Sequence, residues 1–171
     1  MEAPPPAPWS AAEFREYHRR LHERTRRVVA LVPPGDVDWS PAPGWFSLGG
    51  LVRHLARIER WMYAENAVGR PSRYAGHGPE PAQGDGGVLA YYDRLHAEAA
   101  AIFETLDDDA MRRRTTTPGG ASITVWKWLR AMVEHEAHHR GQLYLMLAMR
   151  GVRTPPIFGL TSEEVAARAA S

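Results

Sequence analysis

A histidine-rich octapeptide, residues 135–142, is the part of this sequence whose residue types and spacing could do chemistry. Its sequence is His-Glu-Ala-His-His-Arg-Gly-Gln, and it lies within a long stretch whose apolar residues recur with helical spacing. Residues four apart lie one above the other on a helix, so the imidazoles of His135 and His139 can bind one ion. The first hypothesis is therefore a metal site.

Two kinds of metal chemistry fit this octapeptide. As an H-E-x-x-H motif, it supplies two zinc ligands and Glu136 as a general base, as in zinc metallopeptidases. Without Glu136, it supplies two ligands of a three-histidine site whose third ligand must come from another helix. His54 meets that requirement because it lies beside Leu51 and Ile58 on the apolar face of an earlier helix.

The helix face that carries His135 and His139 is otherwise mostly apolar, and Gln142 lies in the same stripe. Burying an imidazole or an amide without a partner costs roughly 1–3 kcal/mol, so these groups need a shared partner. A metal ion held by His54, His135 and His139 would supply it. The side chains expected to line the pocket or support the ligands are Gln142, Trp61, Trp128, Met132 and His96.

Other residues compete for a chemical role. His18 and His22 repeat the four-residue spacing, but His22 lies among charged residues on a face expected to be solvated. His96 lies on the core face of its helix and could be a fourth ligand or a proton carrier, although a structural role is favoured because a single core histidine is usually hydrogen-bonded. Glu59 lies about 140° around the helix from His54, which favours a salt bridge.

Four amphipathic stretches are predicted to form the helices that position these residues. No stretch alternates with period two, and a capping box at Thr161 predicts a short C-terminal helix. The expected fold is therefore all-α, a four-helix bundle with a short helix at its end. The four helices are bounded by Ser10 and Pro33, by Ser47 and Gly69, by Val88 and Leu106, and by Thr124 and Gly151.

Two segments fall outside these helices. Residues 1–9 are Pro-rich and are expected to form a flexible arm that precedes one domain covering residues 10–171. The Gly- and Pro-rich stretch 67–87 is long for a loop of a compact domain. We expect it either to cover a site or to be disordered.

Composition excludes several classes of function. The chain of 171 residues has no cysteine, which removes disulfides, thiolate ligands and a cysteine nucleophile, so any metal must be held by His, Asp or Glu. A net charge of +1 with interspersed acids does not make a nucleic-acid surface. The apolar runs are too short to span a bilayer and no signal peptide is evident, so a cytoplasmic protein is expected.

Residues 47–55, Ser-Leu-Gly-Gly-Leu-Val-Arg-His-Leu, together with residues 135–143 resemble the DinB-like superfamily of four-helix metalloproteins. The resemblance runs from the first helix to residues 155–159. It implies an up-down-down-up bundle, often a homodimer, that holds one divalent metal ion on three histidines and leaves positions open for water or substrate. Matched residue by residue, the ligands are His54, His135 and His139, and the metal is Zn, Ni, Fe or Mn.

Relatives that the sequence resembles include thiol transferases and isomerases that use mycothiol or bacillithiol. The resemblance implies a metal-dependent S-transferase, with a low-molecular-weight thiol as cosubstrate and an electrophilic small molecule as acceptor. An external thiol suits a chain that has no cysteine of its own. Arg57 and Arg140 are candidates to hold a carboxylate of the thiol, but neither lies squarely on the metal face.

Two alternatives stay open. One is a non-enzymatic metal-binding protein that responds to stress or binds a ligand. The other is the zinc metallopeptidase, which is less favoured because the longer H-E-x-x-H-x-x-G-x-x-H motif fails at positions 142 and 145. If the three-histidine hypothesis holds, Glu136 should mainly pair with a nearby arginine such as Arg140, four residues on.

Overall fold

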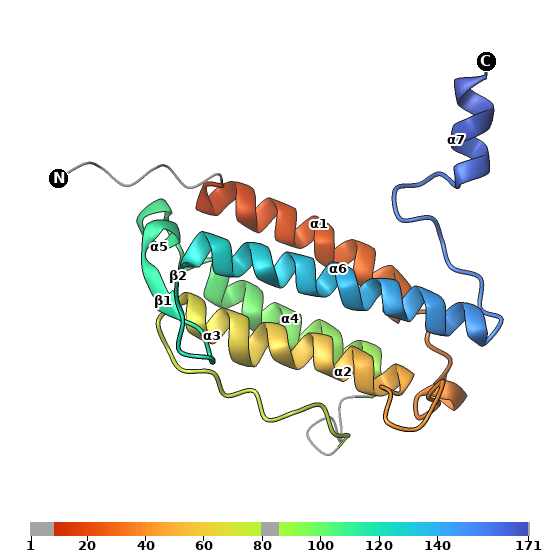
Figure 1. The fold of residues 1–171 in the computed structure, drawn as a ribbon, viewed down its shortest axis with the longest axis horizontal. Helices are drawn as coiled ribbons and strands as arrows, with labels where there is room; N and C mark the ends of the chain where they lie inside the picture. Colours follow the sequence, from red (N-terminus) through yellow and green to blue (C-terminus); the bar gives the residue numbers. More distant parts are fainter. Residues whose placement is uncertain (1–8, 80–85, 171) are drawn as a thin grey trace.

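The computed structural model describes residues 9–79 and 86–170. Within them, four long helical segments pack side by side (Figure 1): α1 (Ala11–Val29), a rod of α2 (Leu48–Ile58), η2 (Glu59–Tyr63) and α3 (Ala64–Ala67), then α4 (Val88–Phe103) and α6 (Val125–Met149). The shorter elements are η1 (Pro34–Asp36), α5 (Asp108–Arg112), β1 (Arg114–Thr116), β2 (Ser122–Thr124) and α7 (Ser162–Ala169). The predicted four-helix bundle is confirmed, and nearly all of the predicted flexible arm lies outside the described residues.

The helix starts lie where the sequence predicts them. Ser10 and Glu13 form a capping box at α1, and the Ser47 side chain accepts a hydrogen bond from the backbone N–H of Gly50 at α2. Thr161 forms a second capping box with Glu164 at α7. These side chains satisfy backbone donors that a helix start leaves without partners, which fixes where each helix begins.

A close backbone contact explains why α2 begins with glycines, which are poor helix formers. The N–H of Gly49 donates to the carbonyl of Val37 at 2.7 Å. A Cβ at position 49 would lie 2.4 Å from Cγ1 of Val37 and 2.9 Å from its carbonyl oxygen. Only a residue without a side chain lets the preceding loop approach the helix this closely.

The region between the third and fourth predicted helices differs from the prediction. Helix α4 ends at Phe103 and not at Leu106, and Asp107 opens α5 by accepting a hydrogen bond from the N–H of Ala110. The next acidic residues lie in the first turn of α5, where they interact favourably with the helix dipole. Strands β1 and β2 then form an antiparallel hairpin in which Thr115 pairs with Ile123. The sequence did not predict these strands.

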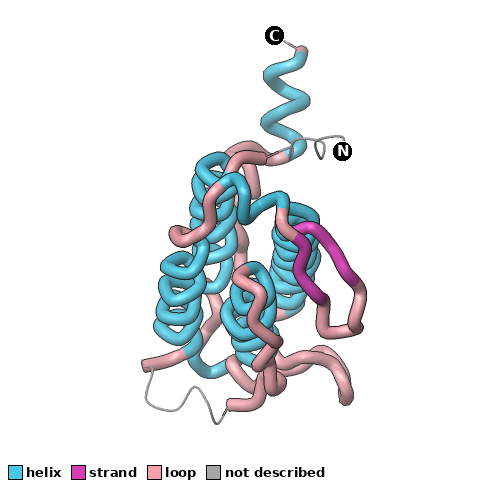
Figure 2. The backbone as a smooth tube through the Cα atoms, turned by 90° about the vertical axis from the view of Figure 1, so that its left-hand side faces the viewer, coloured by secondary structure: helices cyan, strands magenta, loops and turns pink. Residues whose placement is uncertain are grey.

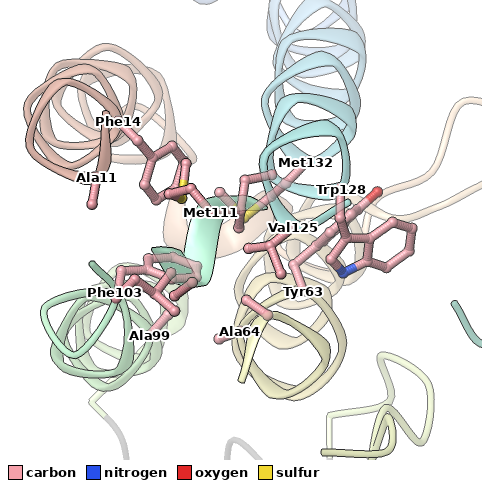
Figure 3. Close-up of a cluster of buried hydrophobic side chains, with 14 residues drawn as sticks. Ala11, Phe14, Tyr63, Ala64, Ala99, Phe103, Met111, Val125, Trp128 and Met132 are labelled. Atoms are coloured by element: carbon pink, nitrogen blue, oxygen red, sulfur yellow. The ribbon is translucent and has the colours of Figure 1, made fainter. Parts of the chain in front are cut away.

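The core joins all four long segments. Figure 3 shows Phe14 of α1, Phe103 of α4, Tyr63 of the rod and Met132 of α6 directed into one cluster of buried side chains. The ring of Phe14 meets the ring of Phe103 edge to face, with centroids 5.3 Å apart. Each such buried side chain contributes roughly 1.5–3 kcal/mol, so the helices that carry the candidate ligands are held rigidly.

Buried Glu65 fastens the segment that follows the rod. Its carboxylate accepts hydrogen bonds from Arg60, Arg70 and Arg73, the last two at 2.6 and 3.1 Å. The N–H of Arg73 also donates to the carbonyl of Trp61 at 2.7 Å. Residues 70–73 are therefore held along the rod, and this part of the 67–87 stretch agrees with the expected cover and not with disorder.

Helix α7 extends away from the bundle (Figures 1 and 2), and every residue in it is exposed. It includes Val165, which is 53% exposed, and it follows Phe158, which is 83% exposed. Within the described ranges, no helix is both long enough and apolar enough to cross a membrane.

Candidate metal centre

Helices α2 and α6 bring His54, His135 and His139 together. Nε2 of His135 lies 3.2 Å from Nε2 of His54 and 3.1 Å from Nε2 of His139. Two nitrogens bound to one zinc ion at about 2.0–2.1 Å with tetrahedral angles lie about 3.3 Å apart. The three ring nitrogens therefore have the spacing of a metal site.

The outer nitrogens of two of these rings are held by hydrogen bonds. Nδ1 of His139 lies 2.6 Å from Oε1 of Gln142, and Nδ1 of His54 lies 2.7 Å from the hydroxyl of Tyr74. An amide oxygen only accepts, so Nδ1 of His139 carries the proton and Nε2 keeps its lone pair. Metal-binding histidines are usually oriented in this way.

The electrostatics of the cluster favour neutral imidazoles. Burial, followed by the neighbouring histidines, lowers the pKa of His54 to about 3. Burial, followed by His139 and His138, lowers the pKa of His135 to about 4, and burial also lowers the pKa of His139. Metals bind the unprotonated ring, so this donor set is ready for a divalent ion at neutral pH.

Aromatic rings enclose the three histidines. The Phe46 ring centroid lies 5.1 Å from that of His54 and 5.9 Å from that of His139. On the other side, the Tyr63 ring lies 5.9 Å from His135 and 4.6 Å from Trp128. Trp128 therefore supports the site through Tyr63 (Figure 3), and Met132 belongs to the same buried cluster.

An apolar cavity of about 330 Å³ lies next to two of the side chains that contact the histidines. It shares Phe46 and Gln142 with the histidine site, and its other walls include Trp45, Leu145 and Met149. These three side chains are largely exposed, at 66%, 61% and 55%. The cavity has the size and the apolar walls to take the carbon body of a small molecule next to Phe46 and Gln142.

Two of the side chains predicted to line the pocket lie elsewhere. Nδ1 of His96 lies 3.1 Å from Oε1 of Glu59, so His96 belongs to a separate cluster of buried polar groups. Trp61 carries the guanidinium groups of Arg60 and Arg73 over its ring, at 4.0 and 4.4 Å from its centroid. Trp61 lies in the π-helical turn η2, where the helix phase changes, and His96 lies on α4 with its ring toward Glu59, so neither side chain reaches the three histidines.

Glu136 is directed into the bundle interior. Its carboxylate accepts hydrogen bonds from the hydroxyls of Thr25 on α1 and, at 3.4 Å, Tyr92 on α4. Burial, with the nearby Glu59 carboxylate, raises the pKa of Glu136. Arg140, its expected partner, instead donates from Nη1 to Thr25 at 3.1 Å, so that expectation is wrong in detail. Glu136 is not placed as a general base beside the histidines.

Sequence reasoning missed three residues of the site: Phe46, Tyr63 and Tyr74. Phe46 and Tyr74 lie in connecting segments, where helical periodicity carries no information about direction. Tyr63 ends the π-helical turn η2, a change of helix phase that the apolar pattern does not reveal. Only their aromatic character near predicted ligands could have marked them as candidates.

Comparisons with known proteins agree with this fold. A DinB-like protein from Bacillus subtilis, YjoA, is 17% identical with a TM-score of 0.70, over 84% of this chain and 96% of its own. A DinB-like protein from Bacillus cereus is 15% identical with a TM-score of 0.70, over 86% of this chain and 97% of its own. Bacillus subtilis YfiT is 20% identical with a TM-score of 0.63, over 89% of this chain and 95% of its own. It is described as a probable metal-dependent hydrolase with an unusual four-helix bundle topology.

At these identities the structures bear on the fold alone. A search of curated proteins gives no match. The sequence profile of the DinB superfamily matches residues 17–143, a span that includes His54, His135 and His139. The chain therefore belongs to the DinB superfamily.

Proposed function

We propose that this protein is a metal-dependent S-transferase that joins a low-molecular-weight thiol, such as mycothiol or bacillithiol, to an electrophilic small molecule. The observation that carries the proposal is the convergence of three Nε2 atoms, with an apolar cavity that shares Phe46 and Gln142 with their site. His54, His135 and His139 would hold the ion. Such an ion supplies Lewis-acid chemistry, which lowers the pKa of a thiol or of water so that its conjugate base is present at neutral pH.

The chain's own residues provide orientation and exclude water. Gln142 and Tyr74 hold two of the rings in fixed positions, and Phe46 covers them. The apolar cavity would take the carbon body of the acceptor. In the transfer, the thiol gives its proton to solvent and its sulfur forms a bond to a carbon of the acceptor. The group displaced from that carbon leaves with the electron pair of the broken bond.

Arg57 is the better of the two candidates to hold a carboxylate of the thiol. Its Nε is buried and has no hydrogen-bond partner within the described residues, and its charge acts on Tyr74 and His77, which cover His54. Arg140 instead donates to Thr25 in the interior. A cytoplasmic homodimer with an up-down-down-up order of helices, and with Zn, Ni, Fe or Mn as the ion, completes the proposal.

Metal-dependent hydrolysis is the second candidate, favoured by the description of the similar YfiT structure. Both reactions need the same histidines and differ in whether thiol or water attacks. A non-enzymatic metal-binding protein remains the alternative if neither occurs. The peptidase hypothesis loses its general base, because Glu136 bonds to Thr25 and Tyr92.

The test is thiol consumption by purified protein with an epoxide or an activated aryl halide, in the presence of zinc. We expect acceleration over the uncatalysed rate, loss of that acceleration on chelation and in His139→Ala, and retention in the matched control His138→Ala, whose side chain is exposed. Ester hydrolysis without thiol consumption would favour the hydrolase. No turnover by fully metal-loaded protein, with several thiols and acceptors, would reject both.

A further inference from the structure

A second cluster of buried ionisable side chains joins α1, η2 and α4. Nε2 of His18 lies 2.6 Å from Oε1 of Glu59, and Nδ1 of His96 lies 3.1 Å from the same oxygen. His18 and Glu59 are only 3% and 4% exposed. The three potential ligand atoms lie within 4.8 Å of one another, a limit that the three nitrogens of the first centre also meet.

The helices present these groups in a way that sequence periodicity obscured. Glu59 opens the π-helical turn η2, and such turns are frequent at functional sites because they redirect side chains. His18 and His22 have the four-residue spacing of His135 and His139, and both face inward. The His22 ring stacks on His96 with centroids 3.3 Å apart, and its buried Nδ1 has no hydrogen-bond partner in the described part of the chain.

The charges around the cluster favour a cation. Burial alone would raise the pKa of Glu59, but His96 and His18 outweigh it and hold that pKa well below its usual range. Burial opposes the positive form of His96, yet Glu59, with Glu136 and Asp93 adding smaller effects, raises the pKa of His96. The interior at this point therefore stabilises a positive charge among imidazole nitrogens and a carboxylate.

A route from solvent reaches the cluster. A surface hollow of about 410 Å³ has His18 and His96 in its wall, together with Arg15, Glu16 and Glu104. A site filled after folding needs such a path, besides suitable ligands and spacing. The hollow also leaves room for water molecules as further ligands.

We propose that His18, Glu59 and His96 form a second binding site for a divalent transition-metal ion. Two imidazoles and one carboxylate are a ligand set used for zinc and for non-haem iron. The ion would take the place of the hydrogen bonds between these groups, and it would link three of the four long helical segments. This site is independent of the one formed by His54, His135 and His139, and of the proposed transferase activity.

The test counts bound metal in a variant whose first centre is removed. Full-length His135→Ala/His139→Ala, freed of metal by chelation, is loaded with Co²⁺ or Zn²⁺, desalted and analysed for metal, with Co²⁺ absorption as a second readout. We expect one equivalent in this variant and two in the wild type. Adding His96→Gln should reduce one equivalent to none, whereas adding His138→Gln, an exposed histidine, should leave it unchanged.

The amount of metal bound by His135→Ala/His139→Ala tests the second site in a protein whose second cluster is unchanged. A folding defect in a variant of that cluster therefore cannot affect this measurement. An absence of bound metal there overturns the proposal. The proposal is also overturned if one equivalent of metal still binds after His96→Gln is added to His135→Ala/His139→Ala and, in a separate protein, after Glu59→Gln is added to it. Activity of the wild type has no bearing on either outcome.

Discussion

Replacing Gln142 by Leu should weaken metal binding without unfolding the protein. Oε1 of Gln142 accepts the hydrogen bond from Nδ1 of His139 at 2.6 Å, so it holds the ring with Nε2 toward the other histidines. Leucine has nearly the same volume and extends the apolar wall of the adjoining cavity. The change therefore removes the acceptor and little else.

The magnitude follows from the position of this hydrogen bond. A half-buried N–H left without an acceptor costs roughly 1–3 kcal/mol, and loss of a group that orients a metal ligand usually costs about 10–100-fold in affinity. Gln142 lies partly exposed, so water can replace part of the lost hydrogen bond. We expect the Kd for zinc to rise about 10-fold, equivalent to about 1.4 kcal/mol.

The assay is competition for Zn²⁺ with a chromophoric chelator, counting only the equivalent that His135→Ala/His139→Ala lacks. Gln142→Glu is the matched control, because its carboxylate keeps the acceptor and should leave the Kd unchanged or lower it. Thermal unfolding of the metal-free proteins checks that the fold is retained. An unaltered Kd in Gln142→Leu would refute the role assigned to this hydrogen bond.

Three further predictions concern the interior, the helix start and acid stability. Glu136→Gln should keep the metal content and most of the thiol-transfer activity, because the hydrogen-bond partners of Glu136 lie on α1 and α4. Metal analysis and the thiol assay measure this, and metal-dependent proteolysis that the wild type shows and Glu136→Gln loses would revive the peptidase hypothesis. Gly49→Ala should lower the free energy of unfolding by about 1–3 kcal/mol, because its Cβ would be overpacked against Val37. Gly141→Ala, which has open space at its Cβ, should raise the free energy of unfolding by about 0.5–1 kcal/mol, and equal effects in denaturant titrations would contradict this. Metal-free protein should lose stability as the pH falls from about 6.5 toward 3, because the pKa values of His54 and His135 are lowered in the folded state and the unfolded chain therefore binds more protons than the folded one. In thermal melts across that range, His135→Ala/His139→Ala should lose less stability than the wild type.

Local signals in the sequence predict the helices well. Apolar periodicity locates the four long segments, and side chains such as Ser10, Ser47 and Thr161 cap the helices that follow them. The spacing of His135 and His139, with His54 on an apolar face, is enough to predict the group that the packing of α2 and α6 brings together. These features depend on contacts within one helix or on its apolar face, which the sequence expresses directly.

Features that depend on contacts between distant segments could not be predicted in the same way. Tyr74 reaches His54 because Glu65 binds arginines of the following segment. The strands β1 and β2 have three residues each, too few for an alternating pattern. An acidic residue such as Asp107 interacts unfavourably with the dipole at the C-terminal end of a helix. In the structure Asp107 instead caps the start of α5, a helix that the sequence did not predict.

The partners of buried acids were hardest to foresee. Angular separation on a helical wheel places Glu59 away from His54, but it does not identify His18 and His96 as its partners. The same holds for Glu136, whose hydrogen-bond donors come from other helices. A wheel describes one helix, whereas these partners depend on how several helices are packed.

The most direct test of the central claim is anomalous diffraction at the zinc edge from crystals of zinc-loaded protein. The account predicts an anomalous peak bonded to Nε2 of His54, His135 and His139 at about 2.0–2.1 Å, with at least one position open to solvent. Gln142 should still accept the hydrogen bond from His139 in that structure. A fully loaded crystal without a peak between these three nitrogens would contradict the claim.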